Sequence, residues 1–208
     1  MRKVARLWRD EAITTAARVL VPSTGDYFTA EPSVLFGREA PLELEIGAGR
    51  GDFIIERASA MPERNFLAIE LAAAVAQLMA VRAGRRRLTN LRVLRMDARP
   101  LIHLMLEPRS LSACHIYFPD PWPKDRQIKH RLFTPMLAQG LTRVLRPDAP
   151  LFIATDVCDY ATAIFPMIEE AGFREIEMAV PGATQTGFAR KFIAEGREVY
   201  ARAFVLAA

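Results

Sequence analysis

From Pro41 onward, short apolar runs alternate with longer segments of helical periodicity. This alternation is typical of a mostly parallel sheet covered by helices, because the chain must cross over between consecutive parallel strands. With 208 residues, of which 51% are hydrophobic, the chain is long enough to bury the core of one such domain. The strands predicted for the parallel part are Leu42–Ile46, Phe66–Ile69, Leu91–Arg95, Cys114–Phe118 and Leu151–Ala154.

Apolar stripes at helical spacing predict helices between these strands. Thr134 followed by Pro135 predicts where one helix begins, and Pro166 should kink another. The stripes are Leu71, Val75, Leu78 and Met79; Met136, Leu137, Leu141, Val144 and Leu145; and Tyr160, Ile164 and Ile168.

Two further strands, Phe173–Val180 and Glu198–Leu206, are predicted near the end of the chain as an antiparallel pair. The predicted fold is therefore α/β and Rossmann-like. It is a seven-stranded, mostly parallel sheet with a terminal antiparallel strand and helices on both faces. Periodicity alone does not separate this arrangement from other doubly wound sheets.

Residues 1–40 have a different pattern, because proline and glycine interrupt them around one short predicted helix over Arg9–Leu20. We expect this segment to form an N-terminal arm or lid rather than a second domain. Residues 41–208 are expected to form the α/β domain.

The sequence favours a cytoplasmic protein without a metal ion. No apolar run is long enough to span a membrane. Charged residues interrupt the first eleven positions, where a secretory signal would be apolar. Cys114 and Cys158 offer neither a disulfide framework nor the paired spacing of a zinc site, so we expect both to be buried. The sequence does not distinguish a monomer from a homodimer.

The net charge of +4 is compatible with a polyanionic partner such as RNA. The basic residues gather in three clusters, each of which could also be a solvated face. The clusters are Arg2, Lys3, Arg6 and Arg9; Arg82 and residues 85–87; and Lys124, Arg126, Lys129, His130 and Arg131.

A glycine turn follows the first predicted strand. Gly47, Gly49 and Gly51, with Ala48 between the first two, let the backbone approach a ligand closely. In a nicotinamide-binding fingerprint the third glycine would stand at position 52, but Asp52 is found there, where the helix N-terminus would otherwise receive a pyrophosphate. A cationic ligand without phosphate, such as S-adenosylmethionine, fits a turn bordered by carboxylates better.

Acidic side chains stand at the carboxyl ends of three successive predicted strands, where open α/β sheets bind their ligands. Glu45 borders the glycine turn. Glu70 follows the second strand and can accept both hydroxyls of a ribose, and Asp97, next to Ala98, can accept from an adenine amino group. We therefore predict that these residues contact the cofactor.

The fourth predicted strand leads into a loop in which Pro119 and Pro121 bracket Asp120. Because proline fixes φ, the carboxylate would be held on a stiff loop beside the cofactor. Trp122 and the third basic cluster follow, which supplies an aromatic ring to read a base and cations to bind phosphates. The cations concerned are Lys124, Arg126, Lys129 and Arg131.

The segment 118–124, with the basic residues after it, resembles the signature of the tRNA (guanine-N7)-methyltransferase family. The likeness extends over residues 41–205. It implies a class I methyltransferase fold, S-adenosylmethionine as cofactor, tRNA as partner, and methyl transfer to N7 of a guanine, expected in the variable loop. It also implies site residues: Glu45, Glu70, Asp97 and Asp120 for the cofactor, Asp120 for the active site, and Lys124 and Asp156 for the substrate.

Thr186, Phe188 and Lys191 resemble the family's Thr-x-Tyr/Phe-Glu-x-Lys substrate segment and are further candidates for substrate binding. Two positions depart from it. Ala189 stands where the family has a glutamate, and Gly187 where a polar residue is common. One contact is thereby missing from the segment, which could reduce the activity or change the substrate.

Guanine N7 carries an in-plane lone pair, so methyl transfer needs no general base and depends on positioning. We expect Asp120 to accept from the Watson–Crick edge of the guanine and to stabilise the developing positive charge. Two alternatives stay open: a methyltransferase of another RNA or of a small molecule, and a non-catalytic RNA-binding relative.

Overall fold

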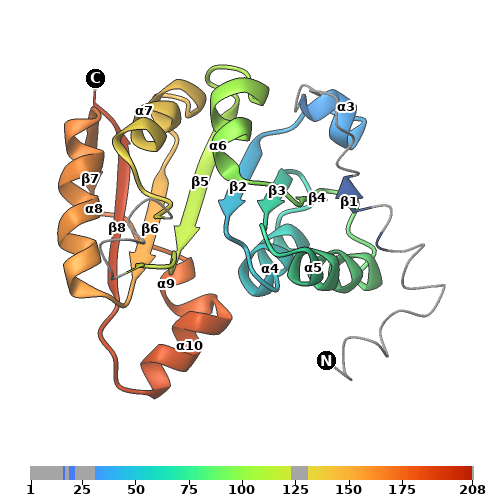
Figure 1. Ribbon diagram of the computed structural model, residues 1–208. Helices are drawn as coiled ribbons and strands as arrows, with labels where there is room; N and C mark the ends of the chain where they lie inside the picture. The colour runs from blue at the N-terminus through green and yellow to red at the C-terminus, as the bar shows by residue number, and fades with distance from the viewer. Residues whose placement is uncertain (1–15, 17–18, 22–30, 123–130, 208) are drawn as a thin grey trace.

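The computed structural model describes residues 16, 19–21, 31–122 and 131–207. These residues form one eight-stranded sheet in the order β1-β4-β3-β2-β5-β6-β8-β7 (Figure 1). The strands are β1 (Leu20–Val21), β2 (Leu42–Ile46), β3 (Asn65–Ile69), β4 (Leu91–Leu94), β5 (Leu111–Tyr117), β6 (Leu151–Thr155), β7 (Phe173–Ile176) and β8 (Tyr200–Leu206). The helices are α3 (Pro32–Phe36), α4 (Asp52–Ala60), α5 (Ala73–Arg85), α6 (Ala98–Pro100), the π-helix η1 (Leu101–Met105), α7 (Pro135–Val144), α8 (Cys158–Glu170), α9 (Gly182–Gln185) and α10 (Gly187–Ala194).

The topology confirms the predicted fold class. Strand β2 lies between β3 and β5 and runs parallel to both, whereas β8 runs antiparallel to β6 and β7. All seven predicted strands are present, although β7 ends at Ile176 rather than at Val180. The strand count differs by one from the prediction, because β1 pairs in parallel with β4 as an eighth strand.

Both faces of the sheet are covered, because alternate residues of each strand point to opposite sides. On one face, Leu44 of β2 and Ile116 of β5 belong to a core cluster that includes residues of η1, α7 and α8. On the other face, the strands pack against α4, α5 and α9. Glu43, Glu45 and His115 occupy the alternate positions of their strands and therefore point to this second face.

Helix α5 is present, but its buried face differs from the predicted apolar stripe. Leu71 precedes the helix and is 69% exposed. The helix instead buries small residues, such as Ala76 and Ala80, beside Met79. Small side chains let a helix approach the sheet closely. A prediction based on large apolar residues does not find such a face, because the alanines that form it are not counted.

Helices α7 and α8 also agree with the sequence in part. The side chain of Thr134 caps α7 as predicted, but Met136 is exposed. Helix α8 continues through Pro166, and the expected kink stays a prediction. Cys114 is buried as predicted, whereas Cys158 is exposed at the start of α8, so that prediction was wrong.

The N-terminal segment contributes to the sheet. Leu20, expected to end a helix over Arg9–Leu20, belongs instead to β1, where it faces Val93 of β4. Most of that predicted helix and the first basic cluster lie outside the described residues. The division of the chain at residue 41 stays a prediction.

Candidate active site

The parallel strands bring the predicted site residues to one edge of the sheet, which we call the carboxyl edge. Figure 1 shows the arrowheads of β2, β3, β5 and β6 pointing toward the end of the molecule where α10 lies. Glu45 lies near the end of β2, Glu70 directly follows β3, and Asp156 directly follows β6. Asp97 and Asp120 lie within three residues of the ends of β4 and β5.

The glycine turn has the backbone geometry that its sequence predicts. Gly47, Gly49 and Gly51 all have positive φ, at 74°, 55° and 74°, a region that residues with a Cβ rarely adopt. A Cβ added at Gly51 would lie 2.6 Å from Cγ of Met79, so the close packing of α5 also requires a glycine there. The N–H groups of Gly47 and of the buried Ala48 donate to the last carbonyl of β3 and hold the turn against that strand.

Glu45 is buried beneath this turn with an unsatisfied carboxylate. Its exposed fraction is 3%, and its Oε2 has no hydrogen-bond partner among the described residues. Burial raises the pKa of Glu45 well above its ordinary value; the backbone amide of Ile54 partly opposes the shift, and the charge of Asp52 adds to it. Because an unpaired buried carboxylate is costly, this oxygen fits a cationic group of a ligand.

Glu70 and Asp97 both make hydrogen bonds within their own turns. Glu70 accepts from the N–H of Gly49 at 3.0 Å and from the N–H of Ala72 at 2.8 Å, so it links the glycine turn to the start of α5. Asp97 caps α6 by accepting from the N–H of Arg99 at 2.9 Å. The pKa of Asp97 is lowered by hydrogen bonds from the Arg99 side chain. The contacts predicted from Glu70, Asp97 and the neighbouring buried alanine to ribose and adenine stay predictions.

Asp120 is exposed on a loop whose backbone is held from two sides. Phe118 and Trp122 have positive φ of 50° and 42°, which is unusual for bulky residues. The N–H of Phe118 donates to the carbonyl of Ala154 at 2.7 Å, so the loop begins against β6. This loop therefore holds a strained conformation that presents Asp120 at the carboxyl edge.

Arg131 holds the other end of this loop. Its Nε donates to the carbonyl of Pro121 at 2.8 Å, and its guanidinium lies 5.3 Å from the ring centroid of Tyr160 on α8. The predicted contact of Arg131 with RNA phosphate stays a prediction, and the contacts present fix the loop. Lys124, Arg126 and Lys129 lie outside the described residues.

The predicted substrate segment forms the N-terminus of α10. Thr186 caps the helix by accepting from the N–H of Ala189 at 2.9 Å, and Ala189 itself is fully buried. Phe188 is 56% exposed and stacks on Phe192 with ring centroids 5.9 Å apart. Lys191 lies 3.8 Å from a carboxylate oxygen of Glu195 one turn later. Helix α10 therefore presents aromatic and cationic side chains next to the carboxyl edge.

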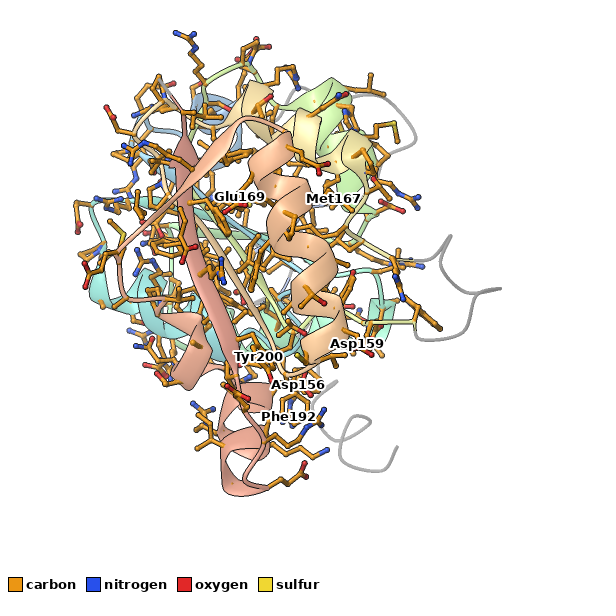
Figure 2. All side chains as sticks on the ribbon, turned by 90° about the vertical axis from the view of Figure 1, so that its left-hand side faces the viewer. Asp156, Asp159, Met167, Glu169, Phe192 and Tyr200 are labelled. Carbon is orange, nitrogen blue, oxygen red and sulfur yellow. The ribbon has the colours of Figure 1, made fainter. Side chains whose placement is uncertain are left out.

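Asp156 is paired with Arg197, a residue that sequence reasoning missed. The two form an ion pair, and the Arg197 guanidinium lies 4.2 Å from the ring centroid of Phe192. Figure 2 shows Asp156 and Phe192 at the same end of the molecule. No local sequence pattern indicates this pair. It follows from the pairing of β8 with β6, in which Thr155 faces Tyr200, so that the residues before β8 lie near those after β6.

Packing accounts for Gly187, one of the two positions at which the substrate segment departs from the family pattern. A Cβ at this position would lie 2.3 Å from Oδ2 of Asp52, so the absence of a side chain lets α10 rest on the first turn of α4. Asp52 also pairs with Arg82 at 2.7 Å, and Arg190 approaches it at 4.0 Å. The carboxylate of Asp52, expected to border a cationic ligand, is therefore balanced by arginine.

The described residues include no group of three His, Cys, Asp or Glu side chains that could hold a metal ion. No helix in this part of the chain is long and apolar enough to cross a membrane.

Comparisons with known proteins identify the family. The family model Methyltransf_4, described as "Putative methyltransferase", matches residues 39–201. Similar proteins from Syntrophotalea carbinolica, Nitrosomonas europaea and Halorhodospira halophila are each named tRNA (guanine-N(7)-)-methyltransferase. They are 38%, 42% and 38% identical over 82%, 72% and 80% of this chain, and the matches cover 76%, 68% and 75% of their own lengths.

Solved structures support the fold at lower sequence identity. The 16S rRNA methyltransferase KamB superposes with a TM-score of 0.65 at 20% identity, covering 92% of this chain and 99% of that one. A SAM dependent methyltransferase from Aquifex aeolicus gives 0.58 at 13% identity, covering 99% and 98%. The predicted class I methyltransferase fold is thereby confirmed, and the methyl donor of such enzymes is S-adenosylmethionine. With the predicted signature and the relatives in agreement, the chain belongs to the tRNA (guanine-N7)-methyltransferase family.

Proposed function

We propose that this chain transfers a methyl group from S-adenosylmethionine to N7 of a guanine in tRNA, in the variable loop. Family membership supports the substrate. The observation that carries the proposal is the buried Glu45, whose unpartnered oxygen lies at the same edge of the sheet as the Asp120 loop. The proposed site for the cationic methyl donor and the Asp120 carboxylate proposed to contact the guanine therefore lie at the same edge of the sheet.

The residues present fit S-adenosylmethionine, because the buried Glu45 oxygen without a hydrogen-bond partner among the described residues can receive a cationic group. When bound, this cofactor supplies an electrophilic methyl group on a sulfonium. Glu45 would balance positive charge of the ligand, and the positive-φ glycines would admit it close to the backbone. The residues proposed to hold it are Glu45, Gly47, Ala48, Gly49, Gly51, Glu70, Asp97, Ala98 and Asp120.

The chain's part in the chemistry is to position the guanine. No proton has to be removed from N7, so the chain needs no general base for the transfer. Orientation of aligned reactants can lower a barrier by roughly 7 to 11 kcal/mol. Asp120 would accept from the Watson–Crick edge and stabilise the positive charge that develops on the purine. The strained loop and the Arg131 contacts hold the backbone on either side of Asp120.

We assign substrate binding to side chains on three segments around Asp120. The carboxylate of Asp156 and the exposed aromatic ring of Phe188 would face the nucleoside, and the cations would contact phosphates. The residues are Lys124, Arg126, Lys129, Arg131, Asp156, Thr186, Phe188 and Lys191. In this proposal residues 1–40 are an N-terminal arm or lid, and the enzyme works in the cytoplasm as a monomer or homodimer.

The test is labelled methyl transfer to an unmodified tRNA transcript, followed by mapping of the methylated base. Replacing Asp120 by asparagine should lower kcat by about 100-fold, because the charge that stabilises the purine is lost. Asp148→Asn is the matched control, since Asp148 is exposed in the turn before β6, at the opposite edge of the sheet. Near-normal turnover of Asp120→Asn with unchanged cofactor affinity would contradict the assignment.

One observation favours a second candidate, a methyltransferase of another RNA or of a small molecule. The fully buried Ala189 supplies no carboxylate at the position where the family segment has a glutamate. Mass analysis of nucleosides from treated tRNA separates the two candidates. N7-methylguanosine supports the first, and a different methylated nucleoside, or none, supports the second.

A further inference from the structure

We infer that an arginine surface beside the glycine turn binds the sugar-phosphate backbone of the RNA outside the reacting nucleotide. The inference rests on the proposed function and adds a second contact region to it. The surface is formed by exposed or half-exposed residues of α5 and the turn after it, of α10 and of the glycine turn. Its members are Arg50, Arg82, Arg85, Arg86, Arg87 and Arg190.

Two carboxylates on α4 connect these arginines into one surface. Arg82 and Arg190 both approach Asp52, at 2.7 Å and 4.0 Å. Arg86 pairs with Glu56 at 2.6 Å. The pKa of Glu56 is lowered first by its hydrogen bond from Arg86 and further by the charges of Arg86, Arg82 and Arg190. Guanidinium groups of α5 and α10 therefore meet at the first turn of α4.

The positive charge of this surface exceeds what the two carboxylates can neutralise. Asp52 and Glu56 pair with three of the arginines, and Arg50, Arg85 and Arg87 are exposed beside them, in a chain whose total net charge is only +4. The side chain of Arg190 is 61% exposed and that of Arg86 is 44% exposed. A guanidinium has five N–H donors in a planar fork, so one that pairs with a carboxylate through one nitrogen keeps donors for a phosphate.

The position of the surface fits a polymer that extends beyond the active site. Arg82 donates to the carbonyl of Arg50 in the glycine turn, and Arg190 lies two residues from the exposed Phe188. A polyanion that places one nucleotide at the carboxyl edge would therefore continue over these arginines. The contacts would be with phosphates and independent of sequence.

The test is the salt dependence of tRNA binding, measured without methyl transfer. Because each phosphate contact contributes about 0.9 to the slope of log K against log salt, Arg86→Ala with Arg190→Ala should lower the slope by about 1 to 2 and weaken binding roughly tenfold. Glu56→Gln should act in the opposite direction and tighten binding, because it removes a negative charge from the surface. Arg174→Ala on β7, at the other side of the sheet, is the matched control and should change neither quantity.

An unchanged slope in the double variant, or weaker binding in Glu56→Gln, would overturn the inference. Both changes are at exposed positions, and unfolding curves of the variants check that the fold is kept. Methyl transfer by the unaltered chain is measured in parallel. If the chain binds tRNA through these arginines but does not methylate it, the inference stands and the proposed function fails. If it methylates tRNA while the double variant keeps its slope, only the inference fails.

Discussion

Glu43 and Glu45 stand two residues apart on β2 and are both buried on the same face of the sheet, yet their surroundings are opposite. Glu43, farther from the carboxyl edge, is surrounded by donors. Glu45, next to the glycine turn, keeps an oxygen without a partner among the described residues. The fold thus surrounds the buried carboxylate of Glu43 with donors and leaves an oxygen of Glu45 without a partner among the described residues, beside the proposed cofactor site.

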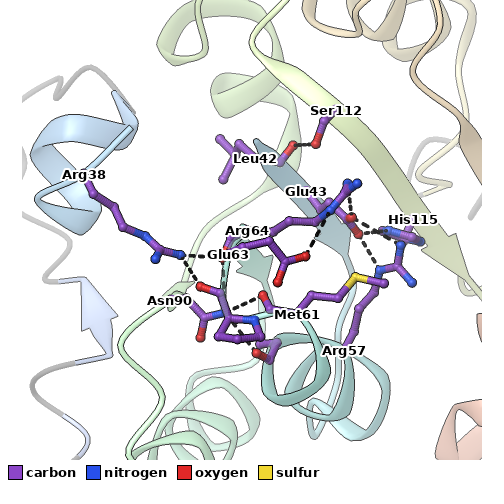
Figure 3. A network of polar contacts seen from close by, with 12 residues as sticks. Arg38, Leu42, Glu43, Arg57, Met61, Glu63, Arg64, Asn90, Ser112 and His115 are labelled. Carbon is purple, nitrogen blue, oxygen red and sulfur yellow. Dashed lines mark hydrogen bonds and ion pairs between the residues drawn. The ribbon is translucent and has the colours of Figure 1, made fainter. Parts of the chain in front are cut away.

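The surroundings of Glu43 form a closed network (Figure 3). It pairs with Arg57 and with Arg64, the latter at 2.9 Å, and accepts from Nε2 of His115 at 3.0 Å. Burial lowers the pKa of His115, so the ring is neutral and its Nδ1 accepts from the hydroxyl of Tyr117 at 2.8 Å. Burial alone would raise the pKa of Glu43, but hydrogen bonds from His115 and Arg57 hold it at about 2.

The surroundings of Glu45 offer fewer groups that stabilise a charged carboxylate. Within the described part of the chain, the backbone amide of Ile54 favours its charged form, whereas burial and nearby Asp52 disfavour it. A buried carboxylate with so little compensation lowers the stability of the unliganded fold. The contrast predicts that Glu43 matters mainly for stability and Glu45 mainly for binding.

The largest expected effect comes from removing the charge of Glu43. Glu43→Gln removes the negative charge and one of the two acceptor oxygens shared by His115, Arg57 and Arg64, and should reduce the free energy of unfolding by about 3 kcal/mol. The lower end of the range for broken buried pairs applies, because both arginine side chains are partly exposed. Urea unfolding measures it. Glu45→Gln is the matched control and should leave the stability unchanged or higher; an equal loss in both variants would remove the contrast.

The next effect concerns the binding of S-adenosylmethionine. Glu45→Gln should weaken it by about 30- to 100-fold, since a charged hydrogen bond to a ligand contributes about 2 to 3 kcal/mol. Isothermal calorimetry measures the dissociation constant. Here Glu43→Gln serves as the control, studied where it remains folded, and its affinity should stay within a few-fold of normal. Tight binding by Glu45→Gln would show that the cofactor does not use this carboxylate.

The sequence was sufficient to predict which segments form seven of the strands and that the acids stand at the carboxyl ends of those strands. The order of the strands in the sheet comes from the structure. Period-2 and helical patterns are local, and the rule that parallel strands end at one edge places Glu70 and Asp97 without knowledge of packing. The difference between Glu43 and Glu45 could not be predicted in this way. Both are glutamates in one apolar strand. The pairing of β2 with β5 sets His115 opposite Glu45, yet the His115 ring bonds the carboxylate of Glu43, and no sequence pattern predicts that choice.

Other features that the sequence missed depend on contacts between distant segments. The fit of Gly187 against Asp52 joins α10 to α4, and the ion pair of Asp156 with Arg197 joins the ends of β6 and β8. Neither has a local signature. Arg131 has a role that the sequence did not indicate, because its Nε and Nη2 donate to carbonyls of the Asp120 loop; its predicted contact with RNA stays a prediction.

A smaller effect should appear in acid. The pKa of Glu43 is lowered from 4.5 to about 2 on folding, so its contribution is full above pH 4.5 and is lost as the pH falls toward 2. The stability difference between the unaltered chain and Glu43→Gln should therefore be about 1.5 kcal/mol smaller at pH 3.5 than at pH 6. Urea unfolding at the two pH values measures it. A difference independent of pH would mean that Glu43 is not charged in the folded state.

The smallest effect is the pH dependence of cofactor binding. It depends on Glu45, whose pKa is raised on folding, whereas that of Glu43 is lowered. The raised pKa of Glu45 gives a stability contribution that is present below its ordinary pKa of 4.5 and is lost as the pH rises through the folded value. A cationic ligand favours the charged form, so binding releases a proton and the affinity should increase with pH by at most about tenfold per unit until that raised pKa is passed. In Glu45→Gln this increase should vanish, and any pH dependence that remains belongs to the ligand's own amino group. If both proteins show the same profile, Glu45 is already ionised before the ligand arrives, and the unpartnered oxygen is not what the cofactor satisfies.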